Sequence, residues 1–158
     1  MTNDYYQKYH QKIWDKILSS NEKVEFSFSI GNSYRKFYLI LWAIICAPLL
    51  FAFGMGIIVY AFVYFYYGFY LKVANVYAFT NKRVLIHRGW LSTQTNSIAY
   101  DKITDIVVSE NFVDRVLTKT GGIALNTAGT SHYEGSLRFI ENPYQIKKKL
   151  EEIINKAK

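Results

Sequence analysis

Few side chains in this sequence have the types and spacings that catalysis or metal binding requires. The three histidines, His10, His87 and His132, lie too far apart to match a metal-ligand motif. We expect His87 to be a solvated or edge residue of a strand. Asp101 and Asp105 stand four residues apart and as a pair would suit acid–base chemistry. A turn-forming Asp101 and an exposed Asp105 explain them more simply.

The common catalytic and nucleotide-binding motifs are also missing from the sequence. It contains no HExxH, no GxSxG and no phosphate-binding loop, and the segment TKTGG has its residues in the wrong order for such a loop. We therefore predict that the protein is not an enzyme. We also predict no catalytic, cofactor-binding or metal-binding residues, and no cofactor.

Basic side chains beside apolar segments are the remaining candidates for a binding site. Each Lys or Arg near an anionic membrane surface contributes about 1 kcal/mol of attraction. Alternation along residues 82–88 favours a barrel strand that buries Val84 and Ile86 and has solvated ends. The basic residues form no run with interleaved aromatics, so we predict no nucleic-acid partner. The candidates for lipid-headgroup contact are Arg35, Lys36, Lys72, Lys82, Arg83 and Arg88.

An apolar run dominates the first half of the chain. Residues 37–71 contain 35 consecutive residues without a charge, whereas a helix needs about 20 apolar residues to cross a bilayer. One helix of this length would be roughly 52 Å long against a hydrocarbon core of about 30 Å. Two short spans with a turn near Gly54 and Gly56 therefore fit better than one tilted span. A buried hairpin in a soluble bundle is the alternative.

The flanks of the apolar run predict its orientation. Arg35 and Lys36 precede it and Lys72 follows it, and positive flanks favour the cytoplasmic side. We therefore expect a cell-membrane protein with two spans and both termini in the cytoplasm.

The segments around the run have the periodicities of a small α+β domain. Residues 3–20 have helical spacing, and the helix either packs on the same chain or lies on the membrane surface. Residues 24–30 alternate as a half-buried strand, with Val24, Phe26, Phe28 and Ile30 on one face. Short strands fill residues 75–141, with a helical turn ending at Gly121–Gly122 and a polar hairpin tip at residues 128–136. An amphipathic helix closes the chain from Pro143.

The strands and their turn residues resemble a known family. The matching segments are YAFTNKRVLIHRGWL, SIAYDKITDIVVSENFVDRVL, GGIALNTAG and LRFIENPYQIKKKLEEI, and SNEKVEF resembles the lead-in "gE.v". They are similar to the bacterial pleckstrin-homology-like family of membrane-linked proteins, with its "lT..R.....G" start. The resemblance implies a curved antiparallel sheet or partly open barrel, capped by a C-terminal helix beside a transmembrane helical hairpin. The chain departs from the family pattern at VLTKTGG, where Leu-Gly is more usual.

Together these features predict three parts: residues 1–36 as a cytoplasmic helix and lead-in strand, 37–71 as a transmembrane hairpin, and 72–158 as a pleckstrin-homology-like domain. We expect the lead-in strand to join the sheet of that domain, with pairing between two copies as the alternative. Three functions remain open: an adaptor for protein partners or its own copies, an anionic-lipid sensor, or a subunit of a larger membrane complex. The expected core residues are Ile98, Ile103, Ile123, Leu125, Phe139, Ile146, Leu150 and Ile153.

Overall fold

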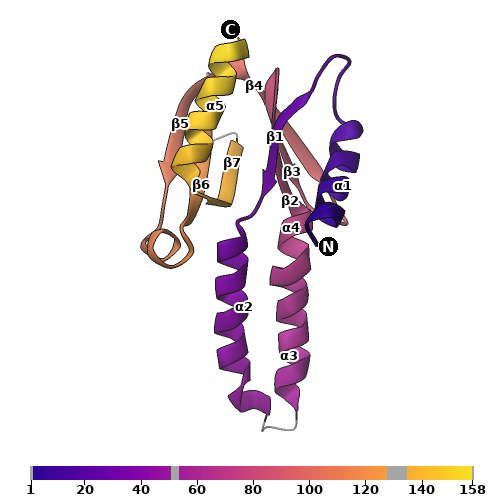
Figure 1. Ribbon diagram of the computed structural model, residues 1–158, viewed down its shortest axis with the longest axis vertical. Coiled ribbons are helices and arrows are strands. Elements are labelled where there is room, and N and C mark those ends of the chain that lie inside the picture. The colour runs from indigo at the N-terminus through magenta and orange to yellow at the C-terminus, as the bar shows by residue number, and fades with distance from the viewer. Residues whose placement is uncertain (1, 51–53, 128–134, 158) are drawn as a thin grey trace.

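The computed structural model describes residues 2–50, 54–127 and 135–157, in which a helical hairpin projects from a β-rich domain (Figure 1). Short 3-10 turns occupy Pro48–Leu50 and Tyr100–Lys102, and π-helical turns occupy Tyr64–Tyr70 and Asp114–Thr118. The helices and strands are α1 (Thr2–Asp15), β1 (Val24–Ser29), α2 (Asn32–Cys46), α3 (Met55–Val63), α4 (Leu71–Ala74), β2 (Asn75–Thr80), β3 (Arg83–Arg88), β4 (Gln94–Ala99), β5 (Ile103–Ser109), β6 (Thr120–Thr127), β7 (Gly135–Glu141) and α5 (Pro143–Ala157).

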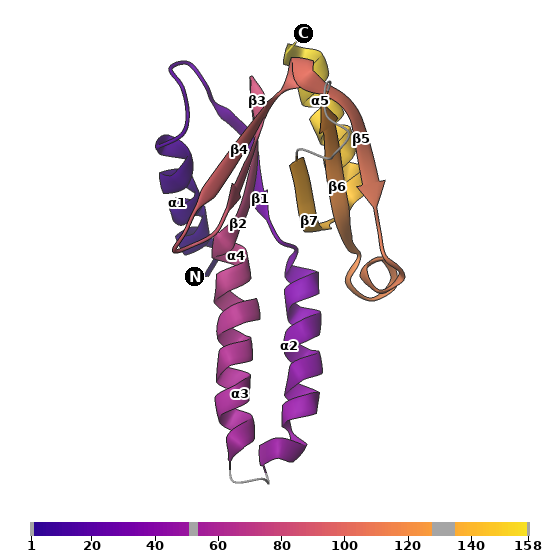
Figure 2. The same cartoon turned by 180° about the vertical axis from the view of Figure 1, so that it is seen from behind.

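Two antiparallel sheets form the β-rich domain. One has the strand order β1-β2-β3-β4 and the other β5-β6-β7, and the short turn at Tyr100–Lys102 connects them. The closing helix α5 lies against β5 and β6, behind these strands in the view of Figure 2. This arrangement confirms the predicted antiparallel fold capped by a C-terminal helix.

The core lies where the two sheets meet α5. Leu150 and Ile153 of α5 are buried there, with Ile146 partly buried against them, so the predicted docking of the closing helix is confirmed. Of the other expected core residues, Ile98, Ile123 and Leu125 are buried and Ile103 is partly buried in the same cluster.

Phe139 is the exception, and the prediction that it joins this core was wrong. Strand β7 carries an extra residue, because Ile123 pairs with Leu137 while Gly121 pairs with Ile140. A bulge of this kind moves the following side chains to the opposite face. Phe139 has φ 53° and stacks on Tyr34 at the base of the hairpin, with ring centroids 4.2 Å apart.

Helix α1 covers the outer face of the first sheet. Trp14 is buried there against Val76, Ala78 and Leu85, so packing on the same chain, rather than on a membrane, is the observed arrangement. Because α1 covers this face, β3 is buried on both sides. The prediction that His87 is solvated was therefore wrong: it is 6% exposed and lies edge-on to Trp14.

Strand β1 is far from the other strands in sequence but belongs to the first sheet. It pairs antiparallel with β2 in the same chain, with Phe28 opposite Tyr77, which confirms that the lead-in strand joins the sheet. An irregularity between Val24 and Phe26 breaks the alternation. Phe26 and Phe28 therefore pack on the main core, whereas Val24 packs under α1 and Ile30 at the hairpin base.

Helix α2 forms one arm of the hairpin, and α3, the π-helical turn and α4 form the other. The second arm is the continuous helix Met55–Ala74. Among the described residues, this is the one helix that is long enough and apolar enough to cross a membrane. The predicted turn at the tip falls partly on residues 51–53, which lie outside the described residues. Of the two glycines expected there, Gly54 has φ 70° and Gly56 lies within α3.

The segment between β5 and β6 differs from its prediction in one respect. The helical turn ends at Lys119, which has φ 52°, and Gly121 and Gly122 already belong to β6. A lysine thus occupies the left-handed position that glycine adopts at lower cost. The predicted polar tip of the following hairpin lies largely in residues 128–134, outside the described residues, as does His132.

Candidate functional site

The six basic residues predicted to meet lipid lie at two opposite ends of the domain. Arg88 pairs with Asn75, the first residue after α4, and Arg35, Lys36 and Lys72 lie in the helices at the same end. Lys82 and Arg83 lie beyond the other end of β2, a six-residue strand of about 20 Å. The structure therefore brings the hairpin-end residues Arg35, Lys36, Lys72 and Arg88 together and separates them from Lys82 and Arg83.

Arg83 belongs to a cluster that joins the segments on either side of the hairpin. Its guanidinium donates two hydrogen bonds of 2.9 Å to the carboxylate of Glu22, whose side chain is 1% exposed. Thr80 Oγ1 donates to the same carboxylate at 2.8 Å and accepts the backbone N–H groups of Lys82 and Arg83. Glu22, Thr80 and Arg83 stand at the Glu, Thr and Arg positions of the patterns "gE.v" and "lT..R", and in this chain the three side chains form one structural cluster.

The cluster changes the acidity of Glu22. Burial raises the pKa of this carboxyl, but hydrogen bonds from Arg83, Ser19 and Thr80 outweigh burial and lower it to about 2. The carboxylate is therefore ionised at all pH values near neutrality. The Arg83 guanidinium forms an ion pair with it, rather than pointing towards lipid.

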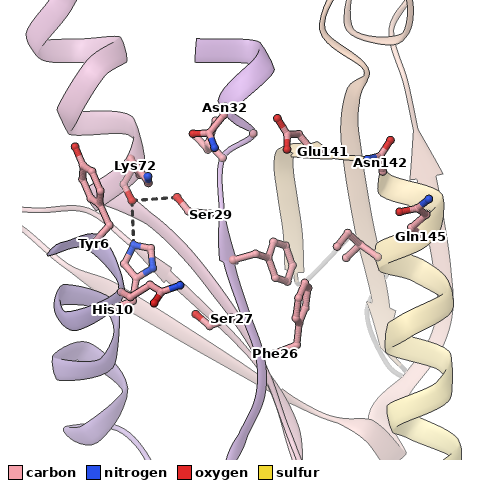
Figure 3. A pocket seen from close by; sticks show the side chains of 15 residues that line it. Tyr6, His10, Phe26, Ser27, Ser29, Asn32, Lys72, Glu141, Asn142 and Gln145 are labelled. Carbon is pink, nitrogen blue, oxygen red and sulfur yellow. Dashed lines mark hydrogen bonds between the residues drawn. The ribbon is translucent and has the colours of Figure 1, made fainter. Parts of the chain in front are cut away.

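A pocket lies beside β1, where the barrel is open. Strand β1 ends one sheet and β7 ends the other, so the backbone of β1 has no strand partner on the side away from β2 among the described residues. The opening contains a pocket of about 360 Å³ between α1, β1 and the start of α5 (Figure 3). Its polar walls are formed by Gln7, His10, Ser27, Ser29, Asn32, Lys72, Glu141, Asn142 and Gln145.

The wall on the α1 side is held by contacts to α4. The Lys72 carbonyl oxygen accepts a hydrogen bond from Ser29 Oγ at 3.0 Å and lies 3.4 Å from His10 Nε2. The Lys72 ammonium lies 3.9 Å from the centre of the Tyr6 ring. Burial is the main cause that lowers the pKa of His10, so His10 is neutral at physiological pH.

The hairpin end of the pocket is closed by a tight approach of β1 to β7. Gly31 donates its backbone N–H to the Phe139 carbonyl at 2.7 Å, and Glu141 accepts hydrogen bonds from the backbone and hydroxyl of Ser33 at 2.8 Å. A Cβ on Gly31 would lie 2.7 Å from Glu141 Cγ. The pocket is therefore a side opening of the barrel that begins next to the hairpin.

The pocket offers hydrogen-bonding groups from several elements. In the described ranges no three His, Cys, Asp or Glu side chains gather as metal ligands. Asp101 lies in an exposed turn and Asp105 is exposed, as predicted, and the Asp105 carboxylate accepts the N–H of Ile106. Hydroxyls, amides and an open strand edge are groups that recognise a peptide backbone.

Sequence reasoning missed this pocket. Its walls come from four separate segments of the chain, which approach one another through the packing of α1, the β1–β2 pairing and the docking of α5. The available signal was the cluster of amides around the start of the closing helix, Asn142 and Gln145, which the helical periodicity leaves exposed.

The fold and pocket can be compared with known proteins. The family described as Bacterial PH domain matches residues 27–157. A crystal structure of a DUF1696 family protein with a pleckstrin-homology domain from Shewanella loihica PV-4 is similar, with 13% identity, a TM-score of 0.52, and coverage of 94% of this chain and 96% of that one. A crystal structure of a pleckstrin homology domain from Shewanella amazonensis SB2B is also similar, with 13% identity, a TM-score of 0.50, and coverage of 91% and 94%. The search of curated proteins gave no significant match.

Proposed function

Because the chain belongs to the bacterial PH domain family, we propose that it is a non-catalytic binding module anchored in a membrane by its hairpin. The observation that carries the anchor is the outer surface of the hairpin, where Ile44, Ile57 and Phe62 are 66%, 66% and 73% exposed. A continuous exposed apolar surface marks contact with lipid or a partner. The hairpin points away from the β-rich domain, which therefore cannot cover it (Figure 1).

The proposed anchor has two spans within residues 37–71, with both chain termini in the cytoplasm. Helix Met55–Ala74 is long enough for one crossing. The return crossing is supported by the pairing of β1 with β2, because both ends of the hairpin enter the same sheet. Arg35, Lys36 and Lys72 flank the hairpin at that end, which favours the cytoplasmic side.

Fusions of a topology reporter test this anchor. A reporter placed before Thr2 and one placed after Lys158 should both report the cytoplasm, and a reporter inserted after Ala52 should report the opposite side. Opposite locations of the two termini would contradict two spans. Extraction of the unfused chain by carbonate would contradict an integral membrane anchor.

The proposed ligand is an extended segment of a protein partner that lies along β1. The main support for this ligand is the open edge of β1, which lies beside a polar pocket of about 360 Å³. A strand edge binds such a segment through its backbone groups, while adjacent pockets receive its side chains. Because Asn32 and Lys72 at the hairpin base line the pocket, the bound segment would lie close to the membrane.

Photo-crosslinking in intact membranes tests the peptide site. A photoreactive residue in place of Gln145, which lines the pocket, should give one adduct that maps to a single segment of one protein. The matched control is Tyr144, which is exposed on the same helix but does not line the pocket. Equal adducts at both positions would contradict the site. An adduct between two copies of the chain would show that the pocket serves self-association. A third probe replaces Ile44, which is exposed on the hairpin; adducts from this probe alone would favour a subunit of a larger membrane complex.

Contact with anionic lipid headgroups is a second candidate function for the basic residues at the hairpin base. Lys36 is exposed there, whereas Arg35 donates to the carbonyl oxygens of Tyr67 and Gly68 and Arg88 donates to the carbonyl and hydroxyl oxygens of Ser136. The full chain in nanodiscs with phosphatidylglycerol should protect Lys36 from an amine reagent, relative to nanodiscs of phosphatidylcholine alone. Lys82 at the far end is the control. Equal protection of both lysines would contradict headgroup contact at the base.

A further inference from the structure

Two loops of the β-rich domain expose large apolar side chains. Leu91, in the turn between β3 and β4, is 90% exposed. Between β5 and β6, Phe112 is 79% exposed, and Val116 and Leu117 are more than half exposed. Within the part of the chain that the structure describes, more than half of each of these four side chains is therefore left uncovered.

The second loop has the reverse of the usual polarity. Asp114 is 7% exposed and Thr118 is fully buried, where the Thr118 hydroxyl donates to the Asp114 carbonyl at 3.0 Å. A loop in water normally exposes its polar side chains and buries its apolar ones. Here the fold buries Asp114 and Thr118 and leaves Phe112, Val116 and Leu117 exposed beside the exposed Arg115 and Lys119, which is the mixture of apolar and basic side chains expected at a lipid interface.

Both loops lie at the hairpin end of the domain. The turn containing Leu91 is attached to α4, because Gly89 donates its N–H to the Ala74 carbonyl at 2.7 Å, and Trp90 contacts Phe65 and Phe69 of the hairpin. The second loop is tied to the end of β7 by a bond from Asn142 N–H to the Lys119 carbonyl. In both views the two loops lie on opposite sides of the hairpin (Figures 1 and 2).

The hairpin is too short, and too directly joined to the sheet, to hold the domain at a distance from a bilayer. Helix α2 has 15 residues, or roughly 22 Å, against a hydrocarbon core of about 30 Å. Strand β1 ends at Ser29 and α2 begins at Asn32, while α4 ends at Ala74 and β2 begins at Asn75. The other arm, Met55–Ala74, has 20 residues, or roughly 30 Å. Because neither arm is longer than the hydrocarbon core and no linker follows, the end of the domain that faces the membrane must sit in the headgroup region.

We propose that the domain docks on the bilayer that holds its hairpin by inserting Leu91 on one side and Phe112, Val116 and Leu117 on the other into the lipid interface. This inference rests on the proposed membrane anchor. The exposed Arg115 and Lys119 of the second loop are placed to meet anionic headgroups above the inserted side chains. Docking on both sides of the hairpin fixes the orientation of the domain and holds the β1 pocket next to the membrane.

Fluorophore labels on single cysteines test the docking. The full chain with Cys46→Ala is reconstituted in vesicles of phosphatidylethanolamine and phosphatidylglycerol, with or without bromine on the acyl chains. Labels at residues 91 and 112 should be quenched by the brominated lipid and shielded from aqueous iodide. Asp101, exposed in the turn before β5 at the far end of the domain, is the aqueous control, and Ile58, exposed on the hairpin, is the control for the anchor.

Each outcome bears on one proposal. Quenching at residues 58, 91 and 112 but not at 101 supports the docking. Quenching at 58 alone, or at only one of the two loops, overturns two-sided docking and leaves the anchor intact. Quenching at 101 as well overturns the specific orientation. No quenching at 58 overturns the membrane anchor itself, and the docking with it.

Discussion

Replacing Glu22 with Gln tests whether the lead-in segment and the sheet form one domain across the hairpin. The carboxylate accepts two hydrogen bonds from Arg83 and one from Thr80, more than fifty residues away in the chain. A fall in the pKa of Glu22 from its ordinary 4.5 to about 2 corresponds, at about 1.4 kcal/mol for each pH unit, to about 3 kcal/mol of stability. We expect Glu22→Gln to lose about this amount at neutral pH.

The loss should depend on pH in one direction. Because the pKa of Glu22 is lowered in the folded state, its contribution is fully present above about pH 4.5 and disappears as the pH falls towards about 2. The difference in the free energy of unfolding between the parent and Glu22→Gln should therefore be constant near neutrality and shrink in acid. Arg83→Gln should show the same pattern, and the double variant should lose much less than the two single losses added together.

The assay is unfolding of the full chain in nanodiscs, followed by fluorescence of Trp14 in a Trp42→Phe, Trp90→Phe background. Trp14 is buried under the first sheet and donates to Ser27 Oγ at 3.0 Å, so it reports on the domain. Glu151→Gln is the control, since the Glu151 carboxylate is exposed and lies 3.8 Å from the partly exposed Lys147 ammonium, so this pair should contribute less than about 0.5 kcal/mol. A Glu22→Gln loss as small as the control, or one that does not change with pH, would refute the reasoning.

Three further substitutions test the packing by the same assay. Leu150→Ala, in the fully buried position of α5, should cost about 2–5 kcal/mol, and a loss below about 0.5 kcal/mol would mean that the helix is not docked. Phe28→Asp places a charge between Tyr77 and Phe79 and should cost at least about 2 kcal/mol; a silent variant would contradict the role of β1 in the sheet. Gly31→Ala should cost about 1–3 kcal/mol because its Cβ would meet Glu141, whereas the control Gly68→Ala meets nothing closer than 3.7 Å; equal effects would contradict the close approach.

Local patterns in the sequence determined the elements of the fold. Period-two alternation identified the strands, Pro143 marked the start of the closing helix, and the uncharged run marked the hairpin. These signals depend on neighbours within one element, which is why they survive without a tertiary structure. The family patterns predicted the fold from the same kind of information, and the two sheets with their capping helix confirm it.

The faces that other elements cover could not be read from alternation. Residues 82–88 predicted a strand with one buried face, yet α1 buries the other face as well and makes His87 a buried residue. Phe139 has the spacing of a core residue, but a bulge in β7 turns it towards the hairpin. One extra residue reverses the direction of a side chain, and the sequence does not mark where that residue is accommodated.

The roles of charged and apolar surface residues were decided by contacts between distant segments. Arg83 was a candidate for lipid contact by its charge alone, and the pairing of β1 with β2 instead brings it to Glu22. Phe112 and Leu117 look like ordinary core residues in sequence, and only the tertiary structure leaves them exposed at the hairpin end. The sequence by itself determined which segments are helical, extended or apolar; the tertiary structure decided which charge is paired and which apolar side chain is left uncovered, because each depends on residues brought together only by folding.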